Sequence, residues 1–223
     1  MSLAREILST LSVTGISSIK HLGRKLGANL RDVEAAIHQI NQGPTFITRL
    51  EGEMVMLSQV SERLCAEKIR AVAGLDADRF SFEVTAKTAS TNDDLLALIR
   101  AGQAQDRLIR IAETQTAGRG TKGRQWISIP GGSVTFSMLR SVSSAAMLRG
   151  IATIPLVVGL SLVRSINALA DVDCRLKWPN DILFDKQKLA GVLIESTSIS
   201  GQCFVVIGIG VNICLPQTLI KDI

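Results

Sequence analysis

The sequence predicts an α+β protein of two domains, a winged helix-turn-helix over residues 1–62 and a larger mixed domain over residues 63–223. Apolar residues recur at helical spacing over the first forty residues, and a hairpin-like segment follows them. Later apolar runs of strand length flank a helical segment at 151–170. Residues 175–212 then form two successive hairpins, which is typical of an antiparallel meander. The larger domain is therefore expected to hold a mixed, largely antiparallel sheet flanked by helices.

Composition excludes several classes of protein. The chain is 46% hydrophobic and 20% charged, as ordinary globular proteins are. Uninterrupted apolar runs stay short, and no basic region precedes an apolar core at the start, so we expect neither a membrane span nor a secretory signal. Four scattered cysteines without a C-x-x-C pair argue against structural zinc or disulfides and favour a reducing cytoplasm. The net charge of +5 permits an anionic partner.

The first domain is predicted from three helices and a hairpin. Gly27 and Ala28 separate the second helix from the third, and Asn29 stands where it can cap the third. Two helices across such a turn indicate a helix-turn-helix. Residues 46–50 and 54–57 form a hairpin around Gly52, the expected wing.

DNA binding is the favoured use of this domain, and a small helical packing module is the alternative. The third helix offers Arg31 and His38 to DNA, but it also carries Asp32 and Glu34. Residues 1–60 hold six basic against five acidic residues, a net of +1, and the wing tip is acidic where phosphate contact favours basic groups.

Ser90, Thr91 and Asn92 directly precede an apolar helix, after a strand around residues 82–84. Such residues cap helices, and the free N–H groups of a helix start also hold polar ligands. The residues alone leave both interpretations open.

A loop at residues 115–126 lies between strand-like runs at 108–112 and 133–139. Its three glycines are interleaved with Arg119, Lys122 and Arg124, and no acid occurs between Thr114 and Arg140, so its positive field is expected to be unopposed. Glycine amides and arginines suit phosphate or carboxylate. The alternative is a flexible, solvated hairpin loop.

The last third combines apolar strands with polar residues at fixed places. Gly159, Ser161 and Ala168 in the helix at 151–170 suggest close packing against a sheet. Asn180 and Asp181 follow a proline and fit a simple turn, and Lys188 fits an edge-protecting lysine. The Gly-x-Gly at 208–210 is not a dinucleotide fingerprint, because a third glycine and a following helix are missing.

Four segments together resemble the biotin protein ligases: residues 90–92, residues 115–126, residues 177–181 with 188–191, and residues 208–212. With the N-terminal winged helix, the chain is similar to the bifunctional bacterial type, ligase and biotin operon repressor in one. The resemblance implies a class II synthetase-like catalytic domain that forms biotinyl-5′-AMP from biotin and ATP. Biotin then passes to a lysine of a biotin carboxyl carrier domain.

The resemblance also implies residue roles. Lys188 and Arg119 would be catalytic. The biotin-binding set would be Ser90, Thr91, Asn92, Gln115, Arg119, Gly120, Thr121, Lys188 and Gly191. The ATP and adenylate set would be Arg119, Arg124, Trp126, Asn180, Asp181 and Asn212. Asp181 would orient either Lys188 or metal-bound phosphates, and Mg²⁺ is implied by the ATP chemistry.

The chain departs from the family pattern at three places. Thr121 stands where an arginine is usual in the adenylate loop, and the wing is acidic rather than basic. Further helices and a small C-terminal β-barrel, which assist ATP and acceptor recognition in the family, are expected to lie outside these 223 residues.

The implied partners are the carrier domain, operator DNA and a second copy when adenylate is bound, with no membrane partner. The alternatives are a lipoate or other acyl ligase of the same fold and a ligand-sensing repressor with a degenerate ligase site.

Overall fold

The computed structural model describes residues 2–41, 47–49, 53–57, 64–128, 132–143 and 150–213. It divides into two compact units, and the second begins at Leu64. Each unit is described on its own.

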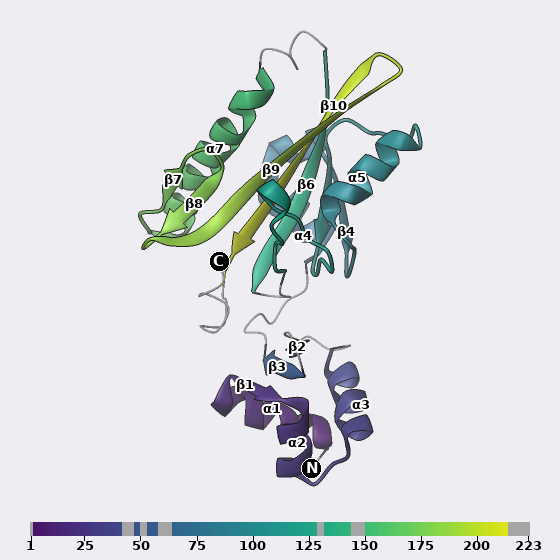
Figure 1. Ribbon diagram of the computed structural model, residues 1–223, viewed down its shortest axis with the longest axis vertical. Coiled ribbons are helices and arrows are strands. Elements are labelled where there is room, and N and C mark those ends of the chain that lie inside the picture. The colour runs from purple at the N-terminus through teal and green to yellow at the C-terminus, as the bar shows by residue number, and fades with distance from the viewer. Residues whose placement is uncertain are drawn as a thin grey trace. The chain divides into compact units, whose positions relative to one another are not determined.

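The first unit contains helices α1 (Leu3–Thr14), α2 (Ile19–Leu26) and α3 (Leu30–Ile40), with strands β1 (Ile16–Ser18), β2 (Ile47–Arg49) and β3 (Met54–Leu57) (Figure 1). The described strands pair antiparallel in the order β1-β3-β2. The sequence did not predict β1, whose three residues are too short for a periodic signal. The turn predicted at Gly52 lies outside the described residues.

Local capping fixes the turn between α2 and α3. Gly27 ends α2 with a left-handed φ of 64°, a conformation that glycine adopts without strain. The Asn29 side chain then accepts a hydrogen bond from the Asp32 backbone N–H at 2.8 Å, which confirms the predicted cap of α3. The apolar faces of the three helices and β3 bury one shared cluster, which includes Ile7, Leu11, Ile19, Leu22, Val33, Ile37, Ile40 and Val55.

The second unit is built on a mixed sheet. Its strands are β4 (Ser81–Thr85), β5 (Leu108–Ala112), β6 (Ser133–Val142), β7 (Arg175–Lys177), β8 (Asp181–Phe184), β9 (Gln187–Ile199) and β10 (Gln202–Asn212). Its helical segments are α4 (Ala66–Ala73), η1 (Gly74–Arg79), α5 (Thr91–Arg100), η2 (Thr121–Gly123), η3 (Ile151–Thr153) and α7 (Ile154–Ala170). The described strands are ordered β4-β5-β6-β10-β9-β8-β7, and β4 and β5 pair in parallel while the other pairs are antiparallel. The predicted mixed, largely antiparallel sheet is confirmed.

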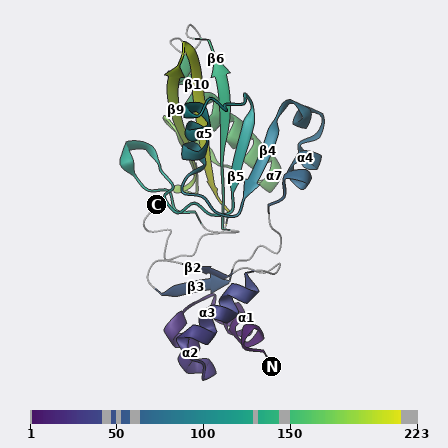
Figure 2. The ribbon, with the colours of Figure 1, turned by 90° about the vertical axis from the view of Figure 1, so that its right-hand side faces the viewer.

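Side-chain alternation along the central strands assigns each helix to its own face of the sheet. On β10, Val206 is buried in a cluster with Leu95 of α5. Its neighbours Val205 and Ile207 point the other way, into the cluster that α7 covers. Figure 2 shows α5 in front of the sheet and α7 behind it.

Helix α7 packs through a narrow stripe rather than through the small residues that the sequence indicated. Gly159 is buried against Leu176, as expected, but Ser161 and Ala168 are exposed, so that part of the prediction was wrong. The segment Ile151–Ala170 is the one described helix that is long and apolar enough to cross a membrane by length and composition. Its residues Val158, Leu162, Val163 and Ile166 nevertheless pack against the sheet, as a covering helix does.

Removing a side chain from the α5 face should destabilise the second unit. Leu139 of β6 is fully buried, so Leu139→Ala should lower the free energy of unfolding by about 2–5 kcal/mol through lost contacts and a cavity. Leu169→Ala on α7 is the matched control, since Leu169 is 87% exposed, and it should change stability by less than about 0.5 kcal/mol. Urea unfolding followed by circular dichroism measures both, and equal effects would contradict the assigned burial.

Candidate active site

Three glycines open a hollow on the α5 face of the sheet. Gly208 and Gly210 of β10 follow Val206 at alternate positions, and Gly191 of β9 pairs with Gly210. Across the strands, Ser137 pairs with Gly208 and Thr135 pairs with Gly210. The centre of this face therefore has no side chains, and the neighbouring strand β6 contributes the hydroxyl groups of Ser137 and Thr135.

Side chains from elsewhere occupy the space that these glycines leave. A Cβ atom on Gly208 would collide with the Asn92 side-chain amide, and one on Gly210 would collide with the Trp126 indole. A Cβ on Gly191 would lie 3.3 Å from the same indole and 3.2 Å from Cε of Lys188. The glycines are thus required by close approach of side chains to the backbone, and this explains the Gly-x-Gly pattern without a dinucleotide.

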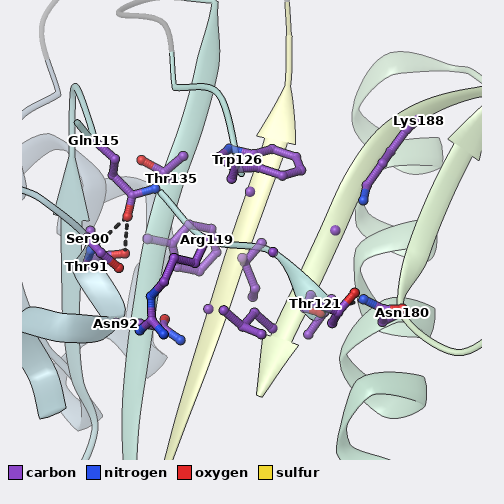
Figure 3. A pocket seen from close by; sticks show the side chains of 18 residues that line it. Ser90, Thr91, Asn92, Gln115, Arg119, Thr121, Trp126, Thr135, Asn180 and Lys188 are labelled. Atoms are coloured by element: carbon purple, nitrogen blue, oxygen red, sulfur yellow. Dashed lines mark hydrogen bonds between the residues drawn. The ribbon is translucent and has the colours of Figure 1, made fainter. Parts of the chain in front are cut away.

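The start of α5 supplies buried polar groups to this hollow. Ser90 caps the helix by accepting from the Asp93 N–H at 3.4 Å, while Thr91 and Asn92 are buried. The Gln115 side chain accepts from the Thr91 N–H at 2.8 Å and from the Thr91 hydroxyl at 3.0 Å (Figure 3). The Thr91 and Ser137 hydroxyl oxygens lie 2.6 Å apart. The three residues at the start of α5 therefore do both: Ser90 caps the helix, and Thr91 and Asn92 present polar groups to the hollow.

Arg119 is not unopposed, as the acid-free loop sequence suggested. Its guanidinium donates two hydrogen bonds to the Glu195 carboxylate, at 3.1 and 3.0 Å, and a third to Asp93. The sequence prediction was wrong on this point, because the acids come from α5 and β9 rather than from the loop. Glu195 was missed altogether. Its spacing of four residues from Gly191 on one strand is the signal that places both on the same face.

Lys188 lies near the start of β9, close to Asp181 of β8 and to Trp126 of the loop at residues 115–126. Its Nζ lies 2.9 Å from Oδ1 of Asp181, and both side chains are less than one-fifth exposed. No further donor among the described residues reaches that oxygen, so the Lys188 ammonium is its one partner there. Nζ also lies 5.7 Å from the centre of the Trp126 ring, and the Asn212 amide donates to the Lys188 backbone carbonyl at 3.1 Å. Because β9 lies between β8 and β10, the edge-lysine interpretation is wrong.

Two adjoining cavities share Lys188 and the loop. The first, of about 40 Å³, is lined among others by all nine residues predicted for biotin: Ser90, Thr91, Asn92, Gln115, Arg119, Gly120, Thr121, Lys188 and Gly191. The second, of about 300 Å³, is lined by Gly120, Thr121, Arg124, Gln125, Trp126, Ile127, Lys188 and Asn212. Asn180, predicted for the nucleotide, lines the first cavity, and its amide is engaged with the Val192 carbonyl at 3.0 Å.

The cationic side chains around the two cavities could neutralise two anionic ligands that meet at Lys188. Lys188 and Thr121 line both cavities, Arg119 lines the first, and Arg124 lines the second. The Trp126 indole N–H is buried against Gly210 without an acceptor among the described residues. The described residues contain no cluster of three metal-binding side chains, so the site offers a magnesium ion no cage of protein ligands.

The residues predicted for DNA lie in the first unit. Arg31 and His38 are both exposed on α3. Nearby, Lys20, Arg24 and Asn29 line a hollow of about 630 Å³ at the turn between α2 and α3.

Comparison with known proteins matches residues 84–212 to the biotin/lipoate A/B protein ligase family. A biotin--[acetyl-CoA-carboxylase] ligase of Mycobacterium tuberculosis is 40% identical over 135 residues, which cover 59% of this chain and 48% of that protein. The bifunctional ligase/repressor BirA of Escherichia coli is 30% identical over 212 residues, 94% of this chain and 63% of that protein. The chain thus spans about half to two-thirds of the length of these relatives.

A solved structure is similar as well. The biotin protein ligase from Aquifex aeolicus in complex with biotin and ATP superposes with a TM-score of 0.52 at 30% identity. The superposition covers 64% of this chain and 57% of that one.

Replacing Gly210 should displace the Trp126 indole from the surface of the sheet. We expect Gly210→Ala to push Trp126 towards water, with a red shift of its fluorescence and a stability loss of about 1–3 kcal/mol. The other tryptophan, Trp178, is 76% exposed and should contribute a constant signal. Gly150→Ala is the control, because a Cβ there meets nothing within 4 Å. An unchanged emission spectrum in Gly210→Ala would show that the indole does not rest on this glycine.

Proposed function

Because the chain belongs to the biotin/lipoate A/B protein ligase family, we propose that it is an ATP-dependent biotin–protein ligase. It joins biotin to AMP with release of pyrophosphate, and then passes biotin to a lysine of a biotin carboxyl carrier domain. The observation that carries the proposal is the position of Lys188, which lines both the small polar cavity and the larger cavity beside the basic loop.

The polar cavity favours biotin over lipoate or another aliphatic acid. Thr91, Asn92 and Gln115 line this cavity, and the first two are buried, so hydroxyl and amide groups converge on its floor. A ureido head has both N–H donors and a carbonyl acceptor and can satisfy such groups. A purely aliphatic tail can exchange no hydrogen bonds with these groups, so the site would gain less from binding it.

In the first step a biotin carboxylate oxygen attacks the α-phosphorus of ATP. A new P–O bond forms, and the bond to the bridging oxygen of the β-phosphate breaks as pyrophosphate leaves. Both reactants are anions, so rate enhancement rests on neutralisation and positioning. Lys188 would stabilise charge between carboxylate and α-phosphate, with Asp181 holding its ammonium in place. Arg119 would act on the biotin side and Arg124 on the phosphate side, and Mg²⁺ would arrive with the nucleotide.

In the second step the amine of an acceptor lysine attacks the acyl carbon of the mixed anhydride. The C–N bond of the amide forms, AMP leaves with the electron pair of the broken C–O bond, and the nitrogen gives up one proton to solvent. Until then the loop would shield the adenylate from water. Thr121, in place of the usual arginine, accepts a hydrogen bond from Nη2 of Arg124 at 3.2 Å, so the hydroxyl helps to order a remaining loop cation.

A second role, repression of a biotin operon, is supported by the first unit. The relative named a bifunctional ligase/repressor aligns over 94% of this chain, and that span includes α2 and α3. The exposed Arg31 and His38 would contact operator DNA, and the basic Lys20 and Arg24 line a hollow with Asn29 and Leu30 at the start of the same helix. The acidic wing is partly neutralised, because Glu53 pairs with Lys20 at 2.9 Å. We expect a homodimer when adenylate is bound, and no membrane partner.

The ligase proposal predicts coupling between biotin and ATP through Lys188. Biotin titrated calorimetrically should bind more tightly with Mg-ATP present, and Lys188→Ala should abolish that gain and slow pyrophosphate release by about a hundredfold or more, because a transition-state cation is lost. Lys87→Ala, in an exposed loop, is the control.

Three other outcomes of the calorimetric titration would each lead to a different conclusion. Biotin binding without any ATP effect would favour the repressor with a degenerate ligase site. Lipoate binding in place of biotin would favour the other acyl ligase. Failure of a folded sample to bind either acid would refute the proposal.

The repressor proposal predicts that one α3 side chain matters for DNA. With biotin and ATP present, Arg31→Ala should weaken binding to a labelled duplex from upstream of the host's biotin-synthesis genes by about tenfold. Arg100→Ala, an exposed arginine of the second unit, should not change the affinity. Fluorescence anisotropy at several salt concentrations measures this, and equal affinities for wild type and Arg31→Ala would remove Arg31 from the interface.

A further inference from the structure

Glu195 is a charged residue among the mainly apolar and glycine residues that β9 and β10 present on the α5 face of the sheet. It lies on β9 in register with Val206 of β10, and Val206 in turn pairs with Leu139 of β6. Gly191, Leu193 and Glu195 alternate along one face of the strand, and the first two line the polar cavity. Glu195 therefore stands at the rim where the cavity meets the buried cluster under α5.

The Glu195 carboxylate holds two groups that the proposed chemistry uses. Its Oε2 accepts from the Asn92 amide Nδ2 at 2.7 Å. Its two oxygens accept from Nη1 and Nη2 of Arg119 at 3.1 and 3.0 Å. The side chain is 23% exposed, so these charge-assisted bonds form in a partly desolvated place, where they are stronger than on an open surface.

The carboxylate also sets the direction of the Asn92 amide. An ionised carboxylate only accepts hydrogen bonds, so Nδ2 must face Glu195 and Oδ1 must face the Ser137 hydroxyl, which donates to it. Ser137 in turn lies 2.6 Å from the Thr91 hydroxyl, whose single proton can go to either Ser137 or Gln115, while the Thr91 backbone N–H donates to Gln115 at 2.8 Å. A continuous series of polar contacts thus runs from Gln115 through Thr91, Ser137, Asn92 and Glu195 to Arg119, which belongs to the same loop as Gln115.

The geometry points to Glu195 as a positioning residue that ties the basic loop to the floor of the acid pocket. It does not touch the reacting atoms in this assignment. It orients Asn92 and keeps Arg119 at the cavity, and Asp93 adds a second hold on the same guanidinium. The catalytic consequence rests on the proposed ligase function, whereas the structural tie does not.

Loop cleavage by trypsin tests the tie without reference to activity. Residues 115–126 contain three trypsin sites, at Arg119, Lys122 and Arg124. Glu195→Gln keeps the shape but removes the charge, so the ligand-free chain should be cut in this loop about tenfold faster, because the locally opened form gains population. Glu83→Gln is the matched control, since Glu83 also pairs with an arginine, Arg110 at 2.8 Å, at the β4 edge of the sheet. Equal cleavage of Glu195→Gln and wild type would overturn the inference.

Pyrophosphate release then tests the catalytic consequence. Glu195→Gln and Arg119→Gln should each lower the biotin-dependent rate by about ten- to hundredfold, and the double variant should be no slower than the slower single variant, because both changes break one unit. Glu195→Asp, which keeps the charge, should restore part of the rate. Multiplying effects would mean that Glu195 acts apart from Arg119 and would overturn the inference. If wild type released no pyrophosphate, the ligase proposal would fall, and the cleavage comparison would still decide the positioning role.

Discussion

The second unit depends on the absence of side chains at three places in its sheet. Gly191, Gly208 and Gly210 let the Asn92 amide and the Trp126 indole rest against backbone. On this face β10 changes from Phe204 and Val206 to glycine, and β9 places Gly191 beside Leu193, so the hollow exists because large side chains stop at these positions. The cavity, the loop at residues 115–126 and Lys188 all lie against these glycines. The charged site therefore depends on a steric condition, the absence of side chains at three positions.

Charge is arranged in pairs rather than as a free positive field. Lys188 is matched by Asp181, and Arg119 by Asp93 and Glu195. Under the proposed function, paired cations would already be in place when an anionic substrate binds, so the reaction would need little further reorganisation. A substrate anion would then have to compete with a carboxylate for the Arg119 guanidinium.

Much of this could be read from the sequence, and the failures have physical causes. Strands and caps with local signals were predicted: Asn29 caps α3, Ser90 caps α5, and the hairpins at 175–212 form the meander. The nine residues predicted for biotin share a cavity, although whether they bind it stays a prediction. The sequence does not show which distant segments come together. Glu195 was therefore missed, and the positive charge of the loop at residues 115–126 was expected to have no acidic partner. Exposure of Ser161 and Ala168 likewise depends on which stripe of α7 meets the sheet, and small size alone does not fix that.

Alternation along β10 also limits how this protein can change over time. Because neighbouring residues face opposite sides, one inserted or deleted residue before Gly208 would exchange the two faces beyond that point. Isoleucine or valine would then fill the hollow, and the glycines would leave voids beneath α7. Loops around the cavity can vary in length while the sheet persists, but β10 can accept only substitutions. Lineages that acquire a different acid substrate from this scaffold should therefore differ by point changes in the strand and by length in the loops.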